Sequence, residues 1–249
     1  MFENAVFVFG SNEAGRHGKG AALSAVKSYG AIYGQGRGLQ GRSYAIPTKA
    51  ADLDVLPLEA VEGHVDEFLA FAKNNPEMTF KVSRVGCGLA GHRDEDIFPM
   101  FQDAPANCIL PGIWEAKRTG VQRLLIAGSR GFTDYAHLCG VTEDAIADWG
   151  LKSPVIVSGG ARGADSLGER FAKDYDLELA VFKAKWNELG RSAGIERNIE
   201  MAWYSTHVLV FWDGSSPGSR HMMGVARDAR LRTKMSVYQM GGLESGLSI

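Results

Sequence analysis

The sequence predicts an α/β protein with two domains, and three observations lead to this prediction. Short apolar runs alternate with helix-like stretches along most of the 249 residues. Glycine is frequent, at 31 residues, and it clusters directly after the apolar runs. The alternation is irregular in the first half and regular in the second, and the polar stretch EAKRTGVQ separates the two. We therefore expect one domain at residues 1–117 and another at 118–249.

In the first half, a strand runs into the glycine-rich loop GSNEAGRHGKGAA and then into a helix that reaches Tyr29. A second helix is expected around Val61–Lys73, because its apolar residues recur at helical spacing. The expected strands are Val6–Phe9, Ser43–Pro47, Thr79–Val85 and Cys108–Leu110. These are the ingredients of an α/β domain with uneven connections.

In the second half, short and almost continuously apolar strands alternate with helices, which is typical of a parallel sheet covered on both faces. The expected strands are Leu124–Ala127, Val155–Val157, Leu179–Phe182, Val208–Phe211 and Met235–Tyr238. The expected helices are Thr142–Trp149, Ala164–Tyr175, Gly194–Tyr204 and Ser219–Arg230. The pattern predicts a doubly wound α/β domain. Residues 239–249, QMGGLESGLSI, contain little to bury, and we expect this end to fray.

Composition excludes several classes of protein. With 45% hydrophobic and 22% charged residues the chain is typical of a globular protein, and no apolar run approaches the roughly 20 residues of a membrane helix. The net charge of -2 gives no overall attraction to nucleic acids or anionic membranes. Three cysteines at unrelated spacings favour a reducing, cytoplasmic setting, and the six histidines lack metal-binding spacing. We therefore predict neither a metal site nor a cofactor.

Glycine-rich loops follow three strands of the second half. Because the carboxyl ends of parallel strands meet at one edge of a sheet, backbone N–H groups and helix N-termini should converge there and favour a phosphate. The candidate binding residues are Gly128, Ser129, Arg130, Ser158, Gly159, Gly160, Arg162, Gly163, Asp165, Arg191, Asn198, Asp213, Gly214, Gly218 and Ser219. The alternative interpretation is that the glycines only make tight turns.

A GxGxxG match at Gly36, Gly38 and Gly41 is rejected as a dinucleotide fingerprint, because the residues after it predict a strand rather than a helix. The stretch GRHGKGAA is rejected as a Walker-type loop, because Lys19 is followed by Gly20 instead of Ser or Thr. Neither classical nucleotide motif is therefore expected.

Four motifs of the second half resemble the YspA-like branch of the SLOG superfamily, which also contains the DprA and lonely-guy proteins. They are GSRGFTD (Gly128–Asp134), SGGARGAD (Ser158–Asp165), GRSAGIERN (Gly190–Asn198) and WDGSSPGS (Trp212–Ser219). The resemblance implies a Rossmann-like domain that binds a nucleotide at those loops, and a homodimer, since such proteins often pair. Met222 occupies the position of the catalytic Glu of lonely-guy enzymes, so their reaction is not expected here.

The first half resembles a compact macrodomain of the kind seen in phage-related proteins, through GSNEAGRHGKGAA (Gly10–Ala22) and GCGLAGHR (Gly86–Arg93). This resemblance implies a three-layer fold and an ADP-ribose-like ligand. The first loop would meet a ribose, with Asn12 and His17 orienting the sugar or an attacking water. The residues implied to bind the ligand are Gly10, Ser11, Gly18, Gly20, Gly86, Gly88 and Gly91.

Three functions follow from these observations. The first is a protein that binds ADP-ribose or an NAD-derived nucleotide and hydrolyses it at a ribose bond. The second is a sensor or sequestering protein for a nucleotide second messenger without turnover, which the lack of a clear acid–base pair favours. DNA binding of the DprA kind ranks last, because neither half is basic enough for a surface that follows a phosphate backbone.

Overall fold

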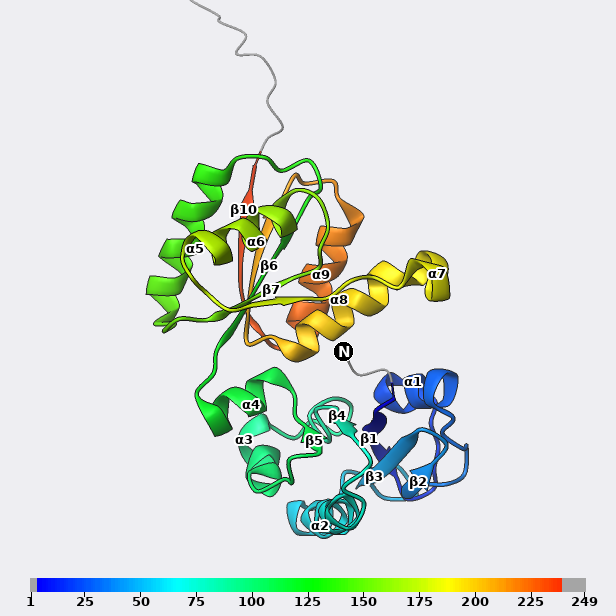
Figure 1. Ribbon diagram of the computed structural model, residues 1–249. Helices are drawn as coiled ribbons and strands as arrows, with labels where there is room; N and C mark the ends of the chain where they lie inside the picture. The colour runs from blue at the N-terminus through cyan, green and yellow to red at the C-terminus, as the bar shows by residue number, and fades with distance from the viewer. Residues whose placement is uncertain (1–3, 239–249) are drawn as a thin grey trace, which may run out of the picture. The chain divides into compact units, whose positions relative to one another are not determined.

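The computed structural model describes residues 4–238, and the chain divides into two compact α/β units between Trp114 and Glu115 (Figure 1). The expected boundary at residues 117 and 118 lies within helix α4 (Gly112–Thr119), so the polar stretch between the halves is mostly helical. The expectation for residues 239–249 lies outside the described residues. No helix among residues 4–238 is long and apolar enough to cross a membrane.

Unit 1 is built on a five-stranded sheet with the strand order β2-β3-β1-β4-β5. Its strands are β1 (Val6–Asn12), β2 (Gly38–Gln40), β3 (Ser43–Lys49), β4 (Phe80–Val82) and β5 (Cys108–Ile109). Only β2, beside β3, is antiparallel to its neighbour. Because the chain leaves β1 toward β3 and later returns to pair β4 on its other side, a crevice forms at the carboxyl end of β1.

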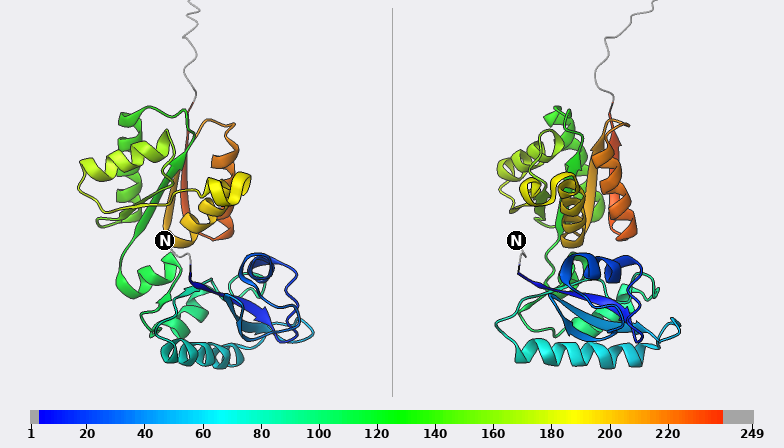
Figure 2. Two further views of the ribbon diagram at one scale, coloured as in Figure 1. Left: turned by 45° about the vertical axis from the view of Figure 1, so that its right-hand side comes forward. Right: turned by 90° about the vertical axis from the view of Figure 1, so that its right-hand side faces the viewer.

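Helices cover both faces of this sheet. They are α1 (Gly20–Tyr29), α2 (Leu58–Asn74), α3 (Asp94–Ile97) and α4, with a 3-10 turn η1 at Phe98–Phe101. Phe9 of β1 packs with residues of α1, whereas its neighbour Val8 packs with residues of α2 and η1. Successive strand residues point to opposite faces, so α1 and α2 lie on opposite sides, as Figure 2 shows. The expected three-layer arrangement is confirmed.

Unit 2 contains an entirely parallel sheet with the order β10-β9-β6-β7-β8. Its strands are β6 (Arg123–Gly128), β7 (Val155–Ser158), β8 (Leu179–Val181), β9 (His207–Trp212) and β10 (Arg232–Val237). The chain builds outward from β6 to β8, then returns to β9 and builds outward to β10. The strand order therefore reverses between β6 and β9, as in a Rossmann-like sheet.

The helices of unit 2 are α5 (Tyr135–Trp149), α6 (Ala164–Asp174), α7 (Trp186–Leu189), α8 (Ala193–Tyr204) and α9 (Pro217–Asp228), with a 3-10 turn η2 at Gly190–Ser192. α5 packs with α6, and α8 packs with α9. The two pairs cover opposite faces of the sheet (Figures 1 and 2). The doubly wound architecture expected from the sequence is confirmed.

Candidate functional site

Unit 1 contains a cavity of about 560 Å³ at the carboxyl ends of its central strands. The ends of β1, β3 and β4 contribute to its wall, together with the loop before α1 and the loop after β4. Seven of the residues expected to bind a ligand line it: Gly10, Ser11, Asn12, Gly18, Gly20, Gly86 and Gly88. The structure thus brings together two sequence motifs that are about 65 residues apart in the chain, because both follow neighbouring strands.

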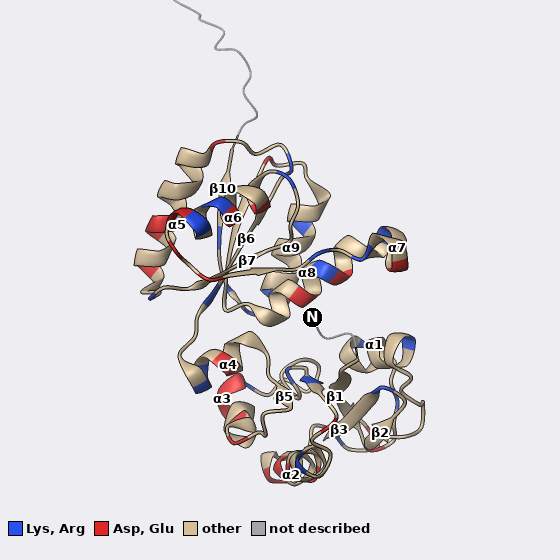
Figure 3. Cartoon of the chain, viewed as in Figure 1, with Lys and Arg blue, Asp and Glu red and all other residues tan. Residues whose placement is uncertain are grey.

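The cavity has a basic wall. Its lining includes Arg16, Lys19, Lys49 and Arg84, and none of the lining residues found within 4–238 is acidic. Acidic residues of unit 1 are frequent on α2 and α3, which carry red segments in Figure 3. Arg84 is paired with Asp94, which lies outside the lining, whereas no acidic side chain of the described residues pairs with Arg16, Lys19 or Lys49. The wall therefore carries a net positive charge, which favours an anionic ligand.

Several glycines of the cavity wall leave room for a ligand. A Cβ atom at Gly18 or Gly88 would meet no atom within 4 Å. Gly86 has a φ of +76°, which favours glycine, and a Cβ at Gly10 would lie 3.3 Å from the Gly86 amide nitrogen. The loop after β4 therefore passes close to the end of β1 and turns its backbone beside the cavity.

Three large apolar side chains stand at the edge of the same cavity. Tyr33, Leu53 and Leu89 line it, and they are 67%, 40% and 66% exposed respectively. Sequence reasoning missed them, since they lie on three separate loops and share no motif. An exposed apolar group next to a basic wall suits a ligand with a flat apolar part and a charged part.

The structure places the two residues named as catalytic differently relative to the cavity. His17 does not line the cavity: it is 2% exposed, packs edge-on against Phe9 and lies with Nε2 2.9 Å from Ser11 Oγ. The side-chain amide of Asn12 donates to the carbonyl oxygen of Arg16 and accepts from its backbone N–H, both at 2.9 Å. Both side chains therefore brace the loop. Asn12 also lines the cavity, so its expected contact with a ligand stays a prediction. Like His17, Gly91 lies outside the cavity lining.

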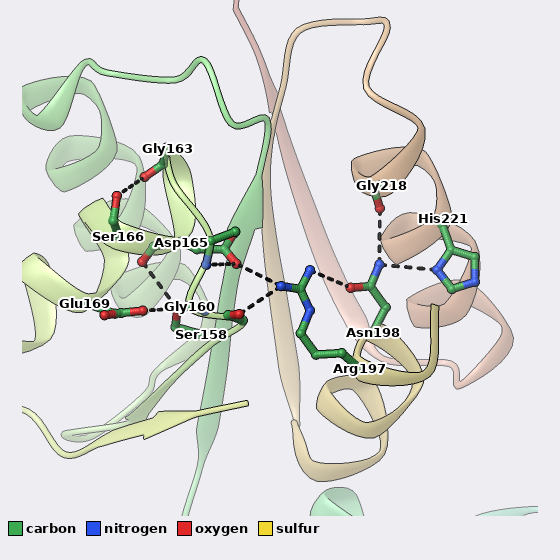
Figure 4. A network of polar contacts seen from close by, with 12 residues as sticks. Ser158, Gly160, Gly163, Asp165, Ser166, Glu169, Arg197, Asn198, Gly218 and His221 are labelled. Carbon is green, nitrogen blue, oxygen red and sulfur yellow. Dashed lines mark hydrogen bonds and ion pairs between the residues drawn. The ribbon is translucent and has the colours of Figure 1, made fainter. Parts of the chain in front are cut away.

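In unit 2, many of the expected site residues form a network of polar contacts among themselves (Figure 4). Asp165 lies at its centre, 3% exposed, and accepts hydrogen bonds from backbone groups of both preceding loops. Burial raises the pKa of Asp165, although the nearby Arg197 acts in the opposite direction. Asp165 therefore clamps the loops after β6 and β7 together.

Arg197 is a central residue of this network that the sequence analysis did not single out. Its Nη1 donates to the Gly159 carbonyl oxygen at 2.8 Å and lies 4.0 Å from Asp165 Oδ2. Its Nη2 donates to Asn198 Oδ1 at 3.2 Å, and Asn198 in turn donates to the Gly218 carbonyl oxygen at 3.2 Å. The two adjacent residues thus tie α8 to the loop after β7 and to α9. Both residues belong to the motif GRSAGIERN, and this was the signal in the sequence that could have pointed to Arg197.

Three glycines of the same loops are closely surrounded by other protein atoms, which are backbone atoms at Gly128 and Gly163 and side-chain ends at Gly159. A Cβ at Gly128 would lie 2.2 Å from the Phe211 carbonyl oxygen, and one at Gly163 would lie 2.3 Å from the Ser129 carbonyl oxygen. A Cβ at Gly159 would lie 2.7 Å from the Arg197 guanidinium. At these positions the interpretation as close-packed turns explains the glycines without a ligand. A Cβ at Gly214 or Gly218 would meet no atom within 4 Å.

The remaining polar residues at the carboxyl edge of the unit 2 sheet are either hydrogen-bonded within the protein or exposed. Ser129 Oγ accepts from the Asp213 amide at 3.1 Å, Asp213 caps the turn before α9, and Ser219 bonds to Ser216. Ser158 Oγ donates to Glu169 and accepts from the Gly160 amide. Arg130, Arg162 and Arg191 are exposed, and no acidic side chain of the described chain pairs with them. These three cations are therefore accessible to an anion.

A second cavity, of about 440 Å³, lies at the opposite edge of the unit 2 sheet. Its wall includes Pro154 and Leu177, which precede β7 and β8, so it opens at the amino ends of the strands. It is distinct from the carboxyl edge at which the sequence predicts a ligand.

Comparison with known proteins identifies the family of the chain. It is 38% identical over 118 residues to the Gene 61 protein of Mycobacterium phage D29, an alignment that covers 44% of this chain and 91% of that protein. The chain belongs to the family of this phage protein. Residues 122–188 of this chain match the YspA, cpYpsA-related SLOG family.

The SLOG match confirms the resemblance for the part of unit 2 from β6 to α7. It includes the loops that contain Arg130 and Arg162, and it ends before α8 and the loop after β9. The match supports a Rossmann-like domain related to nucleotides. The macrodomain resemblance of unit 1 stays a prediction that rests on its motifs.

Proposed function

We propose that this member of the family binds an ADP-ribose-like nucleotide in the cavity of unit 1. The observation that carries the proposal is a cavity whose described lining combines three cations without an acidic partner, the Asp94-paired Arg84 and three apolar side chains, and contains no carboxylate. Its volume of about 560 Å³ falls within the range of small-molecule and cofactor sites. A nucleoside diphosphate has the matching parts, namely an anionic diphosphate and a flat base.

The two ends of such a ligand would use different parts of the wall. The backbone amides of Gly86 and Gly88, together with Arg84, would hold the diphosphate. Tyr33 would stack on the base, because its ring is exposed at the cavity edge. Gly18, which has open space beside it, would allow the ligand to approach the loop before α1.

The geometry favours retention of the ligand over its hydrolysis. General acid–base catalysis at a ribose bond needs a positioned proton donor or acceptor, usually a histidine or a carboxylate. The cavity lining described here contains neither, and Asn12 and His17 are occupied in bracing the loop. Of the functions that the sequence leaves open, a sensor or sequestering protein for the nucleotide therefore ranks above a hydrolase.

A second anionic ligand, nucleotide-related by the SLOG match, would bind the carboxyl edge of unit 2. The favouring observation is that Arg130, Arg162 and Arg191 are exposed there without acidic partners in the described chain. Replacing all three by Gln should abolish retention of that ligand, and unchanged retention would contradict the proposal.

Calorimetric titration of the full chain with ADP-ribose, NAD and cyclic ADP-ribose tests the function of unit 1. We expect ADP-ribose to bind with one site per chain and to be recovered unchanged by chromatography after incubation. Product formation would overturn the assignment as a binder in favour of a hydrolase. Failure of all three compounds to bind would overturn the assignment of the cavity to an ADP-ribose-like nucleotide.

A further inference from the structure

Arg84 is held at the cavity wall by the partly buried carboxylate of Asp94. It follows β4, lines the cavity, and donates from Nε to Asp94 Oδ1 at 2.9 Å and from Nη2 to Asp94 Oδ2. The two side chains are 16% and 14% exposed. A two-point contact of this kind fixes the plane of the guanidinium as well as its position.

Asp94 is itself fixed from the far side. The indole Nε1 of Trp114, a fully buried side chain on α4, donates to Asp94 Oδ1 at 2.7 Å. Burial acts to raise the pKa of Asp94, but the hydrogen bonds from Arg84 and Trp114 and the charge of Arg84 outweigh it, so the pKa lies below its usual value. Asp94 is therefore ionised at neutral pH and joins a rigid aromatic group to the cavity wall.

We infer that Asp94 is a positioning residue, which orients Arg84 toward an anionic group of the bound nucleotide, with Trp114 fixing Asp94 in turn. The inference rests on the proposed function and adds a determinant of affinity that does not line the cavity. An arginine whose orientation is set before binding loses less side-chain freedom when the ligand arrives.

The same carboxylate has an opposing effect, which makes the inference testable. Its negative charge weakens the attraction of Arg84 for an anion, so removing the charge alone would tighten binding. Removing the two-point contact would instead release the guanidinium and weaken binding. The substitution Asp94→Asn does both, since an amide group cannot accept from both nitrogens of Arg84. The sign of the change therefore distinguishes positioning from neutralisation.

The experiment is calorimetric titration of the full chain with ADP-ribose. We expect Asp94→Asn to weaken binding about tenfold, whereas the matched control Asp96→Asn leaves affinity unchanged. Asp96 lies on the same short helix and pairs with the exposed Arg93, with Nη2 to Oδ1 at 2.9 Å. Unchanged or tighter binding by Asp94→Asn overturns the inference.

A double-mutant cycle separates positioning from a purely structural role. If Asp94 acts through Arg84, Asp94→Asn should have no further effect on affinity in an Arg84→Gln background. A further loss of affinity in that background would show that Asp94 only supports the fold, and it would overturn the inference.

A second variant covers the case in which Asp94→Asn lowers the melting temperature too far for titration. Trp114→Phe keeps a buried aromatic ring on α4 but removes the indole donor together with part of the ring, and it should weaken ADP-ribose binding about threefold. Unchanged affinity of a folded Trp114→Phe protein counts against the inference. If the unaltered chain does not bind ADP-ribose, both the proposed function and this inference are wrong. If the unaltered chain binds ADP-ribose and the variants bind it equally well, only this inference is wrong.

Discussion

The imidazole Nε2 of His17 lies 2.9 Å from the Ser11 Oγ, and Ser11 lines the cavity whereas His17 does not. A histidine in a glycine loop suggested a residue that touches a ligand. Because Phe9 packs against the ring and the side chain is buried, His17 instead supports the cavity wall from within.

Burial of His17 predicts a loss of stability in mild acid. Burial lowers the pKa of His17 below its ordinary value of 6.5. As the pH falls below about 6.5, the unfolded chain takes up a proton that the folded chain resists, so the free energy of unfolding decreases. Chemical unfolding between pH 7 and 5 should show this slope, and His17→Gln should make it shallower. Burial and the charge of Arg232 also lower the pKa of His207, so part of the slope should remain in the His17→Gln protein. An identical slope in both proteins would contradict the prediction.

Gly88→Glu should abolish binding in the cavity without unfolding unit 1. No atom lies within 4 Å of a Cβ built at Gly88, so the longer side chain has room. Its negative charge would face the ligand phosphate, and we expect affinity for ADP-ribose to fall by more than about 100-fold. Gly88→Ala is the size control and should retain most of the affinity. A Gly88→Glu protein that binds normally would show that this loop does not approach the ligand.

Tyr33→Ala should weaken nucleotide binding about tenfold, since stacking of a base on an aromatic ring contributes roughly 1–3 kcal/mol. Tyr33 is mostly exposed, so the melting temperature should change little. The neighbouring Ile32 is also exposed but does not line the cavity, so Ile32→Ala serves as control. Titration with ribose 5-phosphate, which has no base, should not distinguish Tyr33→Ala from the unaltered chain; a loss with this probe would argue against stacking.

Arg197→Met should destabilise unit 2 by about 3 kcal/mol, because it leaves the buried Asp165 carboxylate without its cationic neighbour. It also removes the hydrogen bond to the Gly159 carbonyl oxygen. Arg191→Met, at an exposed position, should change the free energy of unfolding by less than about 0.5 kcal/mol. Urea unfolding followed by circular dichroism measures both. Equal stability of the two variants would mean that the network around Asp165 contributes little to the fold.

Most strands and helices could be predicted from the sequence, since their hydrophobic periodicity is local. The start of α5 could not: the predicted helix begins at Thr142, whereas the observed one begins at Tyr135, where Asp134 accepts from the His137 amide and caps the first turn. Similarly, α4 was hidden by its polar composition, although its buried Trp114 anchors it. A single capping residue or one buried aromatic ring can thus determine where a helix forms or begins, although the hydrophobic periodicity of the segment does not indicate it.

The sequence by itself determined the two α/β units and the position of glycine-rich loops directly after strands, because the succession of strands, loops and helices along the chain follows from alternating local patterns. Only the tertiary structure decided which glycines border open space, as Gly18 and Gly88 do, and which are enclosed by other segments, as Gly128 is by Phe211. It also brought Arg16, Lys49 and Arg84 to one cavity and turned His17 away from it. These outcomes depend on contacts between residues far apart in the chain, which no local spacing encodes.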